Sequence, residues 1–428
     1  MSEPQATRGT PHPHPHPVIA HRREVSMKAL SRHATAIRPS PTLSLNARLN
    51  ERVRAGERVL NLCVGEPDFA MPEGGRTAAL HALAAGVDRY TDVAGLPELR
   101  ARIQRKLHEQ NGLDVGPDQI VVSAGAKHAL YNAFFVLCEA GDEVIVPAPY
   151  WVTYPEQVRA VGATPVIVPT HADTAYKLTA ARLEEAITAR TKAIVLNSPG
   201  NPTGATYTER ELAELAAVVE RYDLYVVEDL IYEHFFYEEG TAPSMTAFPA
   251  LRERTVLVNG VSKSCAMTGW RVGYTVASPE ISALVRRIQS QCTSNVAAIA
   301  QHAALGALDD VPWRLLAGYR ERRDAAHARL TAIDGIECLL PTGAFYLFPD
   351  ISRLLGGDHG GRPLATADDF CDRLLETTGV GLVPGTAFGA PGHVRITYAT
   401  DPAVVAEGLG RLGAFAREVR RTTVGSRG

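Results

Sequence analysis

The stretch Ile120-Val121-Val122-Ser123-Ala124-Gly125-Ala126-Lys127 joins three β-branched residues to a turn of small residues and then to a helical pattern over Ala126–Cys138. The apolar run is typical of a buried strand, and the small residues suit a tight turn from strand to helix. A strand that leads directly into a helix is the building unit of α/β proteins. This stretch therefore suggests the fold class that the rest of the chain has to match.

The same unit recurs along the chain after Ile120. Further β-rich runs are expected at Glu143–Val146, Thr164–Val168, Ala193–Asn197, Leu224–Glu228, Thr255–Asn259 and Val272–Ala277, and further helices at Thr179–Ala189, Glu209–Tyr222 and Pro279–Gln291. This alternation predicts an α/β protein with a mainly parallel sheet. Because ligands of such sheets bind at the carboxyl ends of the strands, the residues directly after each run are the first candidates for a site.

The two ends of the chain have other patterns. After a helical stretch around Trp313–Ala332, short runs at Phe345–Phe348 and Val394–Tyr398 and helices near Ala367–Thr378 and Pro402–Val419 predict a separate α+β lobe. Residues 1–26 contain a Pro-His repeat that offers almost nothing to bury, so we expect a disordered tail. Its histidines could bind a metal ion, but nothing else in the tail completes a site.

The chain has 428 residues, of which 45% are hydrophobic and 21% charged, with a formal net charge of −3. This composition fits a globular protein of two or three domains and gives no general electrostatic footprint for nucleic acid or an anionic membrane. The apolar stretches are too short to cross a bilayer, and the start of the chain lacks the apolar core of a secretory signal. Six scattered cysteines favour reduced thiols over disulfides or a zinc site. We therefore expect a cytoplasmic protein without a metal site.

Three segments that follow predicted strands carry polar groups suited to a ligand. Ser123–Lys127 opens a helix and can point backbone N–H groups at an anion, although a plain tight turn would also explain it. Asn197–Gly204 brings the amide of Asn201 to the sheet edge within a dense run of turn-forming residues. Asp229 and Tyr232 follow a very apolar strand, and taken alone they could be a helix N-cap and a core residue.

The stretch Asn259–Tyr274 puts Lys263 just after a strand, with Arg271 eight positions further on. A lone lysine is usually solvated, but Lys263 follows Asn201 and Asp229 in chain order. With these residues the chain resembles class I aminotransferases, the fold type I enzymes that use pyridoxal 5′-phosphate.

The resemblance extends from Ala29 to Ala416 and is strongest to the prokaryotic aspartate aminotransferase subgroup, to which some prephenate aminotransferases also belong. The other matching motifs are Gly65-Glu66-Pro67-Asp68-Phe69, Tyr90-Thr91, Gly95–Arg100, Tyr150-Trp151, Asn201–Gly204, Pro384-Gly385, Phe388-Gly389 and Val394-Arg395-Ile396. The resemblance implies a large domain over residues 75–315 with a mainly parallel seven-stranded sheet. It also implies a smaller α+β domain over residues 316–428, to which residues 27–74 contribute.

The resemblance implies a role for each residue around the cofactor ring. Lys263 forms the internal aldimine, and its freed amine then moves the substrate proton as a general base. Asp229 keeps the ring nitrogen protonated, and Tyr232 and Asn201 bind the phenolic oxygen of the ring. Trp151 stacks on the ring and lines the substrate side, although alone it could be a hydrophobic plug. Lys263, Asp229 and Tyr232 are the expected catalytic residues.

The resemblance assigns the cofactor phosphate to the backbone of Gly125, Ala126 and Lys127 and to the planar fork of Arg271. Tyr90 is expected to reach this phosphate from the partner subunit. A site that is shared in this way implies an obligatory homodimer.

The resemblance also implies how the substrates bind. Arg395 matches the residue that binds the α-carboxylate, with help from the Gly65 backbone and Asn201. Thr42 and Lys127 match positions that recognise a distal carboxylate, although Lys127 could be a solvated helix residue. We therefore expect amino-group transfer from aspartate to 2-oxoglutarate by a ping-pong mechanism.

Two positions depart from the pattern. Many relatives have serine where this chain has Gly260, so one phosphate contact is either missing or supplied by Ser262. Close relatives usually have an acidic residue where this chain has Leu230.

Other functions fit parts of the same pattern. The scaffold could carry out β-elimination or oxidation of an amino acid, or act on prephenate, aromatic or neutral substrates, since a fold does not fix its reaction. A non-catalytic sensor domain of a transcription regulator would need a DNA-binding module ahead of the scaffold, and residues 1–28 are too short to supply one.

Overall fold

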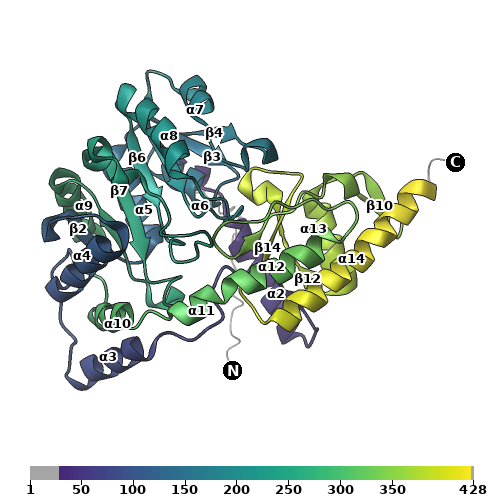
Figure 1. Cartoon of the computed structure of the whole chain (residues 1–428), viewed down its shortest axis with the longest axis horizontal. Helices are drawn as coiled ribbons and strands as arrows, with labels where there is room; N and C mark the ends of the chain where they lie inside the picture. Colours follow the sequence, from purple (N-terminus) through teal and green to yellow (C-terminus); the bar gives the residue numbers. More distant parts are fainter. Residues whose placement is uncertain (1–27, 426–428) are drawn as a thin grey trace, which may run out of the picture.

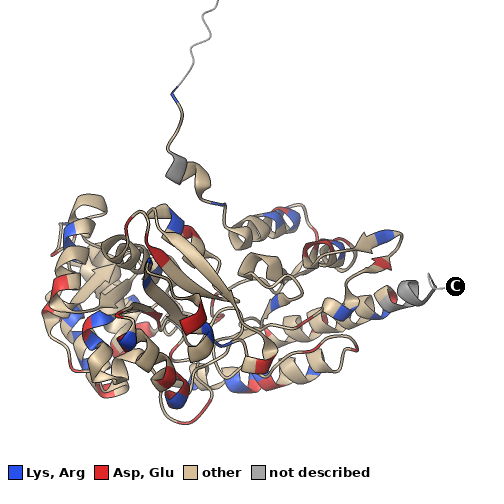
Figure 2. Ribbon diagram, turned by 90° about the horizontal axis from the view of Figure 1, so that it is seen from above, with Lys and Arg blue, Asp and Glu red and all other residues tan. Residues whose placement is uncertain are grey.

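The structure is a computed structural model that describes residues 28–425 of the chain, so the predicted tail over residues 1–26 lies outside the described part. Figure 1 shows two lobes side by side, with a large sheet in one and the C-terminal helix along the outer side of the other. Figure 2 shows both basic and acidic residues on helices of each lobe. No helix within residues 28–425 is long and apolar enough to cross a membrane.

The larger lobe is built on one seven-stranded sheet, and all seven predicted runs form its strands. In chain order they are β2 (Ile120–Ser123), β3 (Glu143–Ala148), β4 (Thr164–Pro169), β5 (Thr191–Asn197), β6 (Tyr225–Asp229), β7 (Thr255–Gly260) and β8 (Gly273–Val276). Their spatial order is β2-β8-β7-β6-β5-β3-β4, and β8 alone runs antiparallel to its two neighbours. The sheet is therefore mainly parallel, as predicted.

Successive side chains of a strand point to opposite faces of the sheet, so neighbouring residues of these strands pack in two different hydrophobic layers. Val144 and Val146 pack in the layer that contains residues of helices α5, α6 and α9, whereas Ile145 packs in a layer with α7 and α8. Helices α4 and α10 cover the β2 end of the sheet. The helices of this lobe are α3 (Glu73–Ala84), α4 (Pro97–Asn111), α5 (Ala126–Leu137), α6 (Thr153–Ala160), α7 (Ala180–Ala186), α8 (Glu209–Arg221), α9 (Pro279–Cys292) and α10 (Ala298–Asp309).

The smaller lobe packs helices against short strands. It contains the three-stranded sheet β13-β14-β9 and the hairpin β10-β11. Its elements are β9 (Tyr346–Leu347), β10 (Gly357–His359), β11 (Arg362–Leu364), α13 (Ala367–Thr378), β12 (Val380–Gly381), β13 (Val383–Pro384), β14 (Val394–Thr397) and α14 (Pro402–Gly425). The predicted helical stretch around Trp313–Ala332 is two helices, α11 (Trp313–Ala317) and α12 (Tyr319–Thr331), which meet at Gly318.

The N-terminal segment reaches both lobes. It begins with α1 (Arg32–Ala36) and α2 (Pro41–Arg54), and its strand β1 (Leu60–Asn61) pairs in parallel with β12. Leu49 of α2 is buried among Phe348, Val383 and Phe388 of the smaller lobe. Helix α3, which follows, packs along α10 instead. Residues between α2 and α3 therefore pass from one lobe to the other beside the carboxyl ends of the parallel strands.

Candidate active site

A cavity of about 570 Å³ lies at the carboxyl ends of the parallel strands, between the two lobes. Its wall brings together predicted residues from segments that are far apart in the sequence: Thr42, Gly65, Ala126, Lys127, Trp151, Asn201, Asp229, Tyr232, Lys263, Arg271 and Arg395. Gly125 and Tyr90 are not part of this wall. Tyr90 is 89% exposed, and Gly125 lies directly before the first residue of α5.

Lys263 follows β7 and extends its amine into the cavity. Its Nζ donates to the carbonyl oxygen of Gly65 at 2.5 Å. Burial lowers the pKa of Lys263 from 10.5 to about 8. An amine with such a pKa is neutral in an appreciable fraction of molecules near neutral pH, which is what a nucleophile or a base requires.

Asp229 ends β6 with a buried carboxylate that is fixed on both oxygens. Tyr154 Oη donates to its Oδ2 at 2.8 Å, and the Ile231 N–H donates to its Oδ1 at 3.1 Å. Burial raises the pKa of Asp229 to about 6, and these two hydrogen bonds oppose the rise. The carboxylate is therefore mostly ionised at neutral pH and held in one orientation.

Tyr154 is a site residue that the sequence reasoning missed. It lies one helical turn after Trp151, and the two rings meet edge to face with centroids 5.3 Å apart. No local pattern pointed to Tyr154, because only the folded structure brings its hydroxyl to Asp229, 75 residues further along the chain.

Arg395 is buried and held from several sides. Its Nη1 donates to Asn201 Oδ1 at 3.0 Å and its Nη2 to the carbonyl oxygen of Cys63 at 2.7 Å. Its guanidinium lies over the rings of Tyr346 and Phe388, 4.4 and 5.1 Å from their centroids. Each Nη carries two N–H groups and uses one of them in these contacts, so the guanidinium can still donate to a further acceptor in the cavity.

Helix α5 and Arg271 form a cationic end of the cavity. The N–H groups of Ala126 and Lys127 lie in the first turn of α5, where no preceding turn supplies acceptors. The Gly125 N–H differs, because it donates to the Ser123 carbonyl oxygen at 2.7 Å. Arg271 donates to the carbonyl oxygen of Thr268 at 2.8 Å. An anion at this end would meet backbone donors and a guanidinium together.

Lys127 lies between this end and the tryptophan. Its Nζ is 4.9 Å from the Trp151 ring centroid, a cation–π distance. Burial, and then the charge of Arg271, lower its pKa. Lys127 is nevertheless exposed to solvent, so its position fits both a role in the cavity wall and the alternative of a solvated helix residue.

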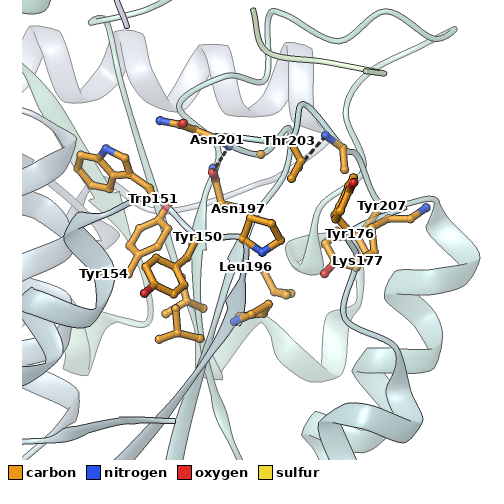
Figure 3. Close-up of a pocket in the computed structure, with 16 residues that line it drawn as sticks. Tyr150, Trp151, Tyr154, Tyr176, Lys177, Leu196, Asn197, Asn201, Thr203 and Tyr207 are labelled. Carbon is orange, nitrogen blue, oxygen red and sulfur yellow. Dashed lines mark hydrogen bonds between the residues drawn. The ribbon is translucent and has the colours of Figure 1, made fainter. Parts of the chain in front are cut away.

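A second cavity of about 40 Å³ adjoins the main one and shares Trp151, Tyr154, Asn197 and Asn201 with it. Figure 3 shows Trp151 and Tyr154 on one side of it and Tyr176, Lys177 and Tyr207 on the other, with Asn197 between them. Asn197 Oδ1 accepts from the Asn201 N–H at 2.9 Å, and Asn197 Nδ2 donates to the Asp229 carbonyl oxygen at 2.9 Å. Asn197 thus ties the Asn201 turn to the end of β6.

A buried polar cluster also supports the segment after β6. Glu233, next to Tyr232, accepts hydrogen bonds from Lys106, Asn111 and Asn259. Asn259 belongs to β7, and Lys106 to α4. The cluster therefore joins the strand that leads to Lys263 with the segment that carries Tyr232.

The two departures from the family pattern have structural explanations. A Cβ at Gly260 would lie 2.7 Å from the Val272 carbonyl oxygen and 2.8 Å from Gly273 Cα, so a side chain there would force the backbone to move. Ser262 lines the cavity, and so does Thr268 further along the same segment. Leu230 is fully buried in the hydrophobic layer with Leu257 and does not reach the cavity.

A mainly parallel sheet that presents a lysine at its carboxyl edge, opposite an arginine from a second lobe, is the arrangement of a fold type I transferase. The family model described as aminotransferase class I and II matches residues 57–412, and the chain belongs to this family. The protein is therefore an aminotransferase.

Relatives with similar sequences carry names that agree with this assignment. An aspartate/prephenate aminotransferase of Cereibacter sphaeroides is 44% identical over 397 residues, covering 91% of this chain and 99% of the relative. An aspartate aminotransferase of Geobacillus stearothermophilus is 40% identical, covering 90% of this chain and 98% of the relative.

Solved structures of the same kind have the same fold. An aspartate aminotransferase from Rhizobium meliloti has a TM-score of 0.88 and 38% identity, covering 92% of this chain and 100% of that one. An aspartate aminotransferase from Thermus thermophilus with maleate has a TM-score of 0.85 and 41% identity, covering 91% and 100%. The predicted fold class, the family and the class of enzyme are confirmed.

Proposed function

We propose that this aminotransferase holds pyridoxal 5′-phosphate at Lys263 and transfers the amino group of aspartate to 2-oxoglutarate by a ping-pong mechanism. The observation that carries the proposal is that one cavity wall combines the buried Lys263 amine with Arg395, whose two Nη groups each keep an N–H that is not used in the contacts with Asn201 and Cys63. The lysine suits a carbonyl group, and the arginine suits a carboxylate.

The residues of the cavity fit the cofactor. When bound, pyridoxal phosphate supplies an electron sink for the bond broken at the substrate Cα. Asp229 would hold a proton on the ring nitrogen, and Tyr232 would donate to the phenolic oxygen. The Ala126 and Lys127 N–H groups and Arg271 would bind the phosphate.

Substrate orientation and proton transfer would belong to three side chains. Arg395, with Asn201, would fix the α-carboxylate, so that the hydrogen on the substrate Cα points to one side. Lys263 would take up this proton and return it to C4′ of the cofactor, because part of its amine is neutral near neutral pH.

We expect the rate at which Lys263 in the apoprotein captures pyridoxal phosphate to rise about tenfold per pH unit below about pH 8 and to level off above it. Only the neutral amine attacks, and burial lowers its pKa to about 8. Stopped-flow absorbance of cofactor loading measures this profile. Pyridoxamine phosphate has no aldehyde for the lysine to attack, so the pH dependence of its binding rate is the control for effects of pH on non-covalent binding. A rate that climbs to pH 10 would contradict the lowered pKa.

An acidic substrate fits the other residues of the cavity. Lys127 is an exposed cation on the wall, and Thr42 adds a hydroxyl at the start of α2. The Thermus thermophilus structure, whose enzyme is 41% identical, holds a dicarboxylate, maleate. Prephenate is a second candidate, because the 44% identical relative is named for it, and prephenate too carries a second carboxylate.

We expect Lys127→Ala to reduce activity on aspartate and 2-oxoglutarate much more than on alanine and pyruvate, because only the first pair carries a distal carboxylate. Loss of one charge-assisted hydrogen bond should lower the ratio of the two kcat/KM values about ten- to hundredfold. Arg395→Ala is the matched control, since it should weaken every substrate. An equal fall for both pairs in Lys127→Ala would show that Lys127 serves the cofactor or the fold instead.

We also propose that the enzyme works as a cytoplasmic homodimer. Tyr90 is 89% exposed, and Leu80 and Leu83 of α3 expose more than half of their surface, as expected for a face that a second copy covers. All six cysteines are free thiols, which suits a reducing compartment. The mass of the holoenzyme in solution, with and without Leu80→Glu, tests the dimer.

A further inference from the structure

Tyr346 is a cavity residue to which neither the family motifs nor the proposed reaction assigns a role. It lies on β9, where it pairs with Thr397 of β14, the strand that carries Arg395. Its side chain is fully buried, yet it forms part of the cavity wall. A tyrosine in such a position has its hydroxyl available for the site and little freedom to move.

The Tyr346 side chain touches residues from both sides of the cavity. Its Oη is 2.9 Å from Tyr232 Oη, and its ring centroid is 4.4 Å from the Arg395 guanidinium carbon. A Cβ at Gly65 would lie only 2.7 Å from the Tyr346 hydroxyl, so glycine is the residue that leaves room for it. One phenol thus contacts the cofactor side and the carboxylate side together.

The direction of the hydrogen bond between Tyr346 and Tyr232 follows from the number of protons that the two hydroxyls carry. Each tyrosine hydroxyl has one proton to donate and can accept from a neighbour. If Tyr232 donates to the phenolic oxygen of the cofactor, as the proposed function requires, it has none left for Tyr346. Tyr346 must then be the donor of the 2.9 Å contact.

We propose that Tyr346 is a positioning residue that acts in two ways: its hydroxyl donates to Tyr232 and directs the Tyr232 proton to the cofactor, and its ring supports Arg395. This inference rests on the proposed function. Hydrogen bonds in a buried chain strengthen one another, so donation by Tyr346 makes Tyr232 a better donor. The ring contributes a cation–π contact that keeps the guanidinium in place.

The hydroxyl is tested by the pH at which the visible absorption band of the loaded enzyme changes. A hydrogen-bond donor stabilises the negative charge on the phenolic oxygen of the cofactor. The oxygen then binds less tightly the proton that it shares with the adjacent nitrogen, so the proton is lost at a lower pH and the midpoint falls. We expect Tyr232→Phe to raise the midpoint by about 1–2 pH units and Tyr346→Phe by about 0.2–0.6 units. Tyr398→Phe is the matched control, because this tyrosine is equally buried but donates to the Ala344 carbonyl oxygen, away from the cavity. It should leave the midpoint unchanged.

The double variant separates this role from a general structural one. With Tyr232 already replaced by phenylalanine, Tyr346→Phe should cause no further shift, since the residue it acts through is gone. An unchanged midpoint in the single variant, or an equal shift in both backgrounds, would overturn the inference while leaving the proposed function intact. A wild-type enzyme without a pH-dependent visible band would overturn the proposed function and this inference with it.

The ring is tested by the affinity for maleate, measured from the change in the same band. Tyr346→Phe keeps the ring, so maleate affinity should stay within about twofold of wild type. Tyr346→Leu removes the ring and should weaken maleate binding about three- to thirtyfold. Equal affinity in the phenylalanine and leucine variants would show that the ring does not support Arg395.

Discussion

Lys263→Ala is expected to lose the visible absorbance of the bound cofactor and to lower transamination by at least about 10⁴-fold. Lys263 is the one amine we assign both to holding the cofactor and to moving the proton, so its loss removes both functions at once. The side chain is buried at the cavity wall, and its hydrogen bond goes to a carbonyl oxygen of the adjoining segment. Absorbance spectra and coupled assays measure the two effects.

The loss of absorbance and activity supports this role of Lys263 only if the variant is folded. Truncation of Lys263 removes a charge from a buried site, so the thermal unfolding temperature of the apoprotein should stay the same or rise. Lys177→Ala is a matched control, because Lys177 lies in the adjoining cavity and pairs with Glu211. If Lys263→Ala keeps the visible band and near-normal turnover, Lys263 is not the residue that carries the cofactor.

Asp229→Asn is expected to bind the cofactor but to lower kcat about 10²- to 10³-fold. An amide can accept or donate a hydrogen bond at the ring nitrogen, but it has no charge to keep that nitrogen protonated. Tyr154 and the Ile231 N–H now donate to the two carboxylate oxygens; in the variant, the amide oxygen can accept from the Ile231 N–H, and the amide NH2 can donate to the Tyr154 hydroxyl. The fold and the position of the side chain should therefore survive the change.

A chemical rescue separates charge from geometry. A cofactor methylated on the ring nitrogen carries a fixed positive charge and needs no carboxylate to maintain it. Turnover of Asp229→Asn should rise with this cofactor, whereas that of wild type should not. Unchanged turnover of Asp229→Asn with the ordinary cofactor would refute the assigned role.

Local sequence patterns predicted most of the larger lobe. The seven strands lie where apolar, β-branched runs were found, because buried parallel strands need such residues on both faces. The helical stretch before the smaller lobe was wrong in one respect, since it breaks at Gly318, where the helix-breaking tendency of glycine was not given enough weight. The domain limits at residues 75 and 316, the dimer and the disordered tail remain predictions.

Part of the candidate site could also be predicted from the sequence. Asp229 and Lys263 lie at or just after the carboxyl ends of strands, so their meeting at one cavity could be anticipated, whereas Arg395 lies within β14 and was assigned through the family resemblance. Tyr154 and Tyr346 could not be found in this way, because their roles depend on hydroxyl contacts across long sequence separations. Such contacts are decided by tertiary packing, which no local pattern reports.

The most direct test of the account follows the amino group itself. The purified holoenzyme is given ¹⁵N-aspartate and 2-oxoglutarate, and the nitrogen-containing products are identified by mass spectrometry. The enzyme should form ¹⁵N-glutamate in an amount equal to the oxaloacetate formed, and, without 2-oxoglutarate, it should complete no more than one turnover per active site. Release of ¹⁵N-ammonia in place of ¹⁵N-glutamate would contradict this prediction.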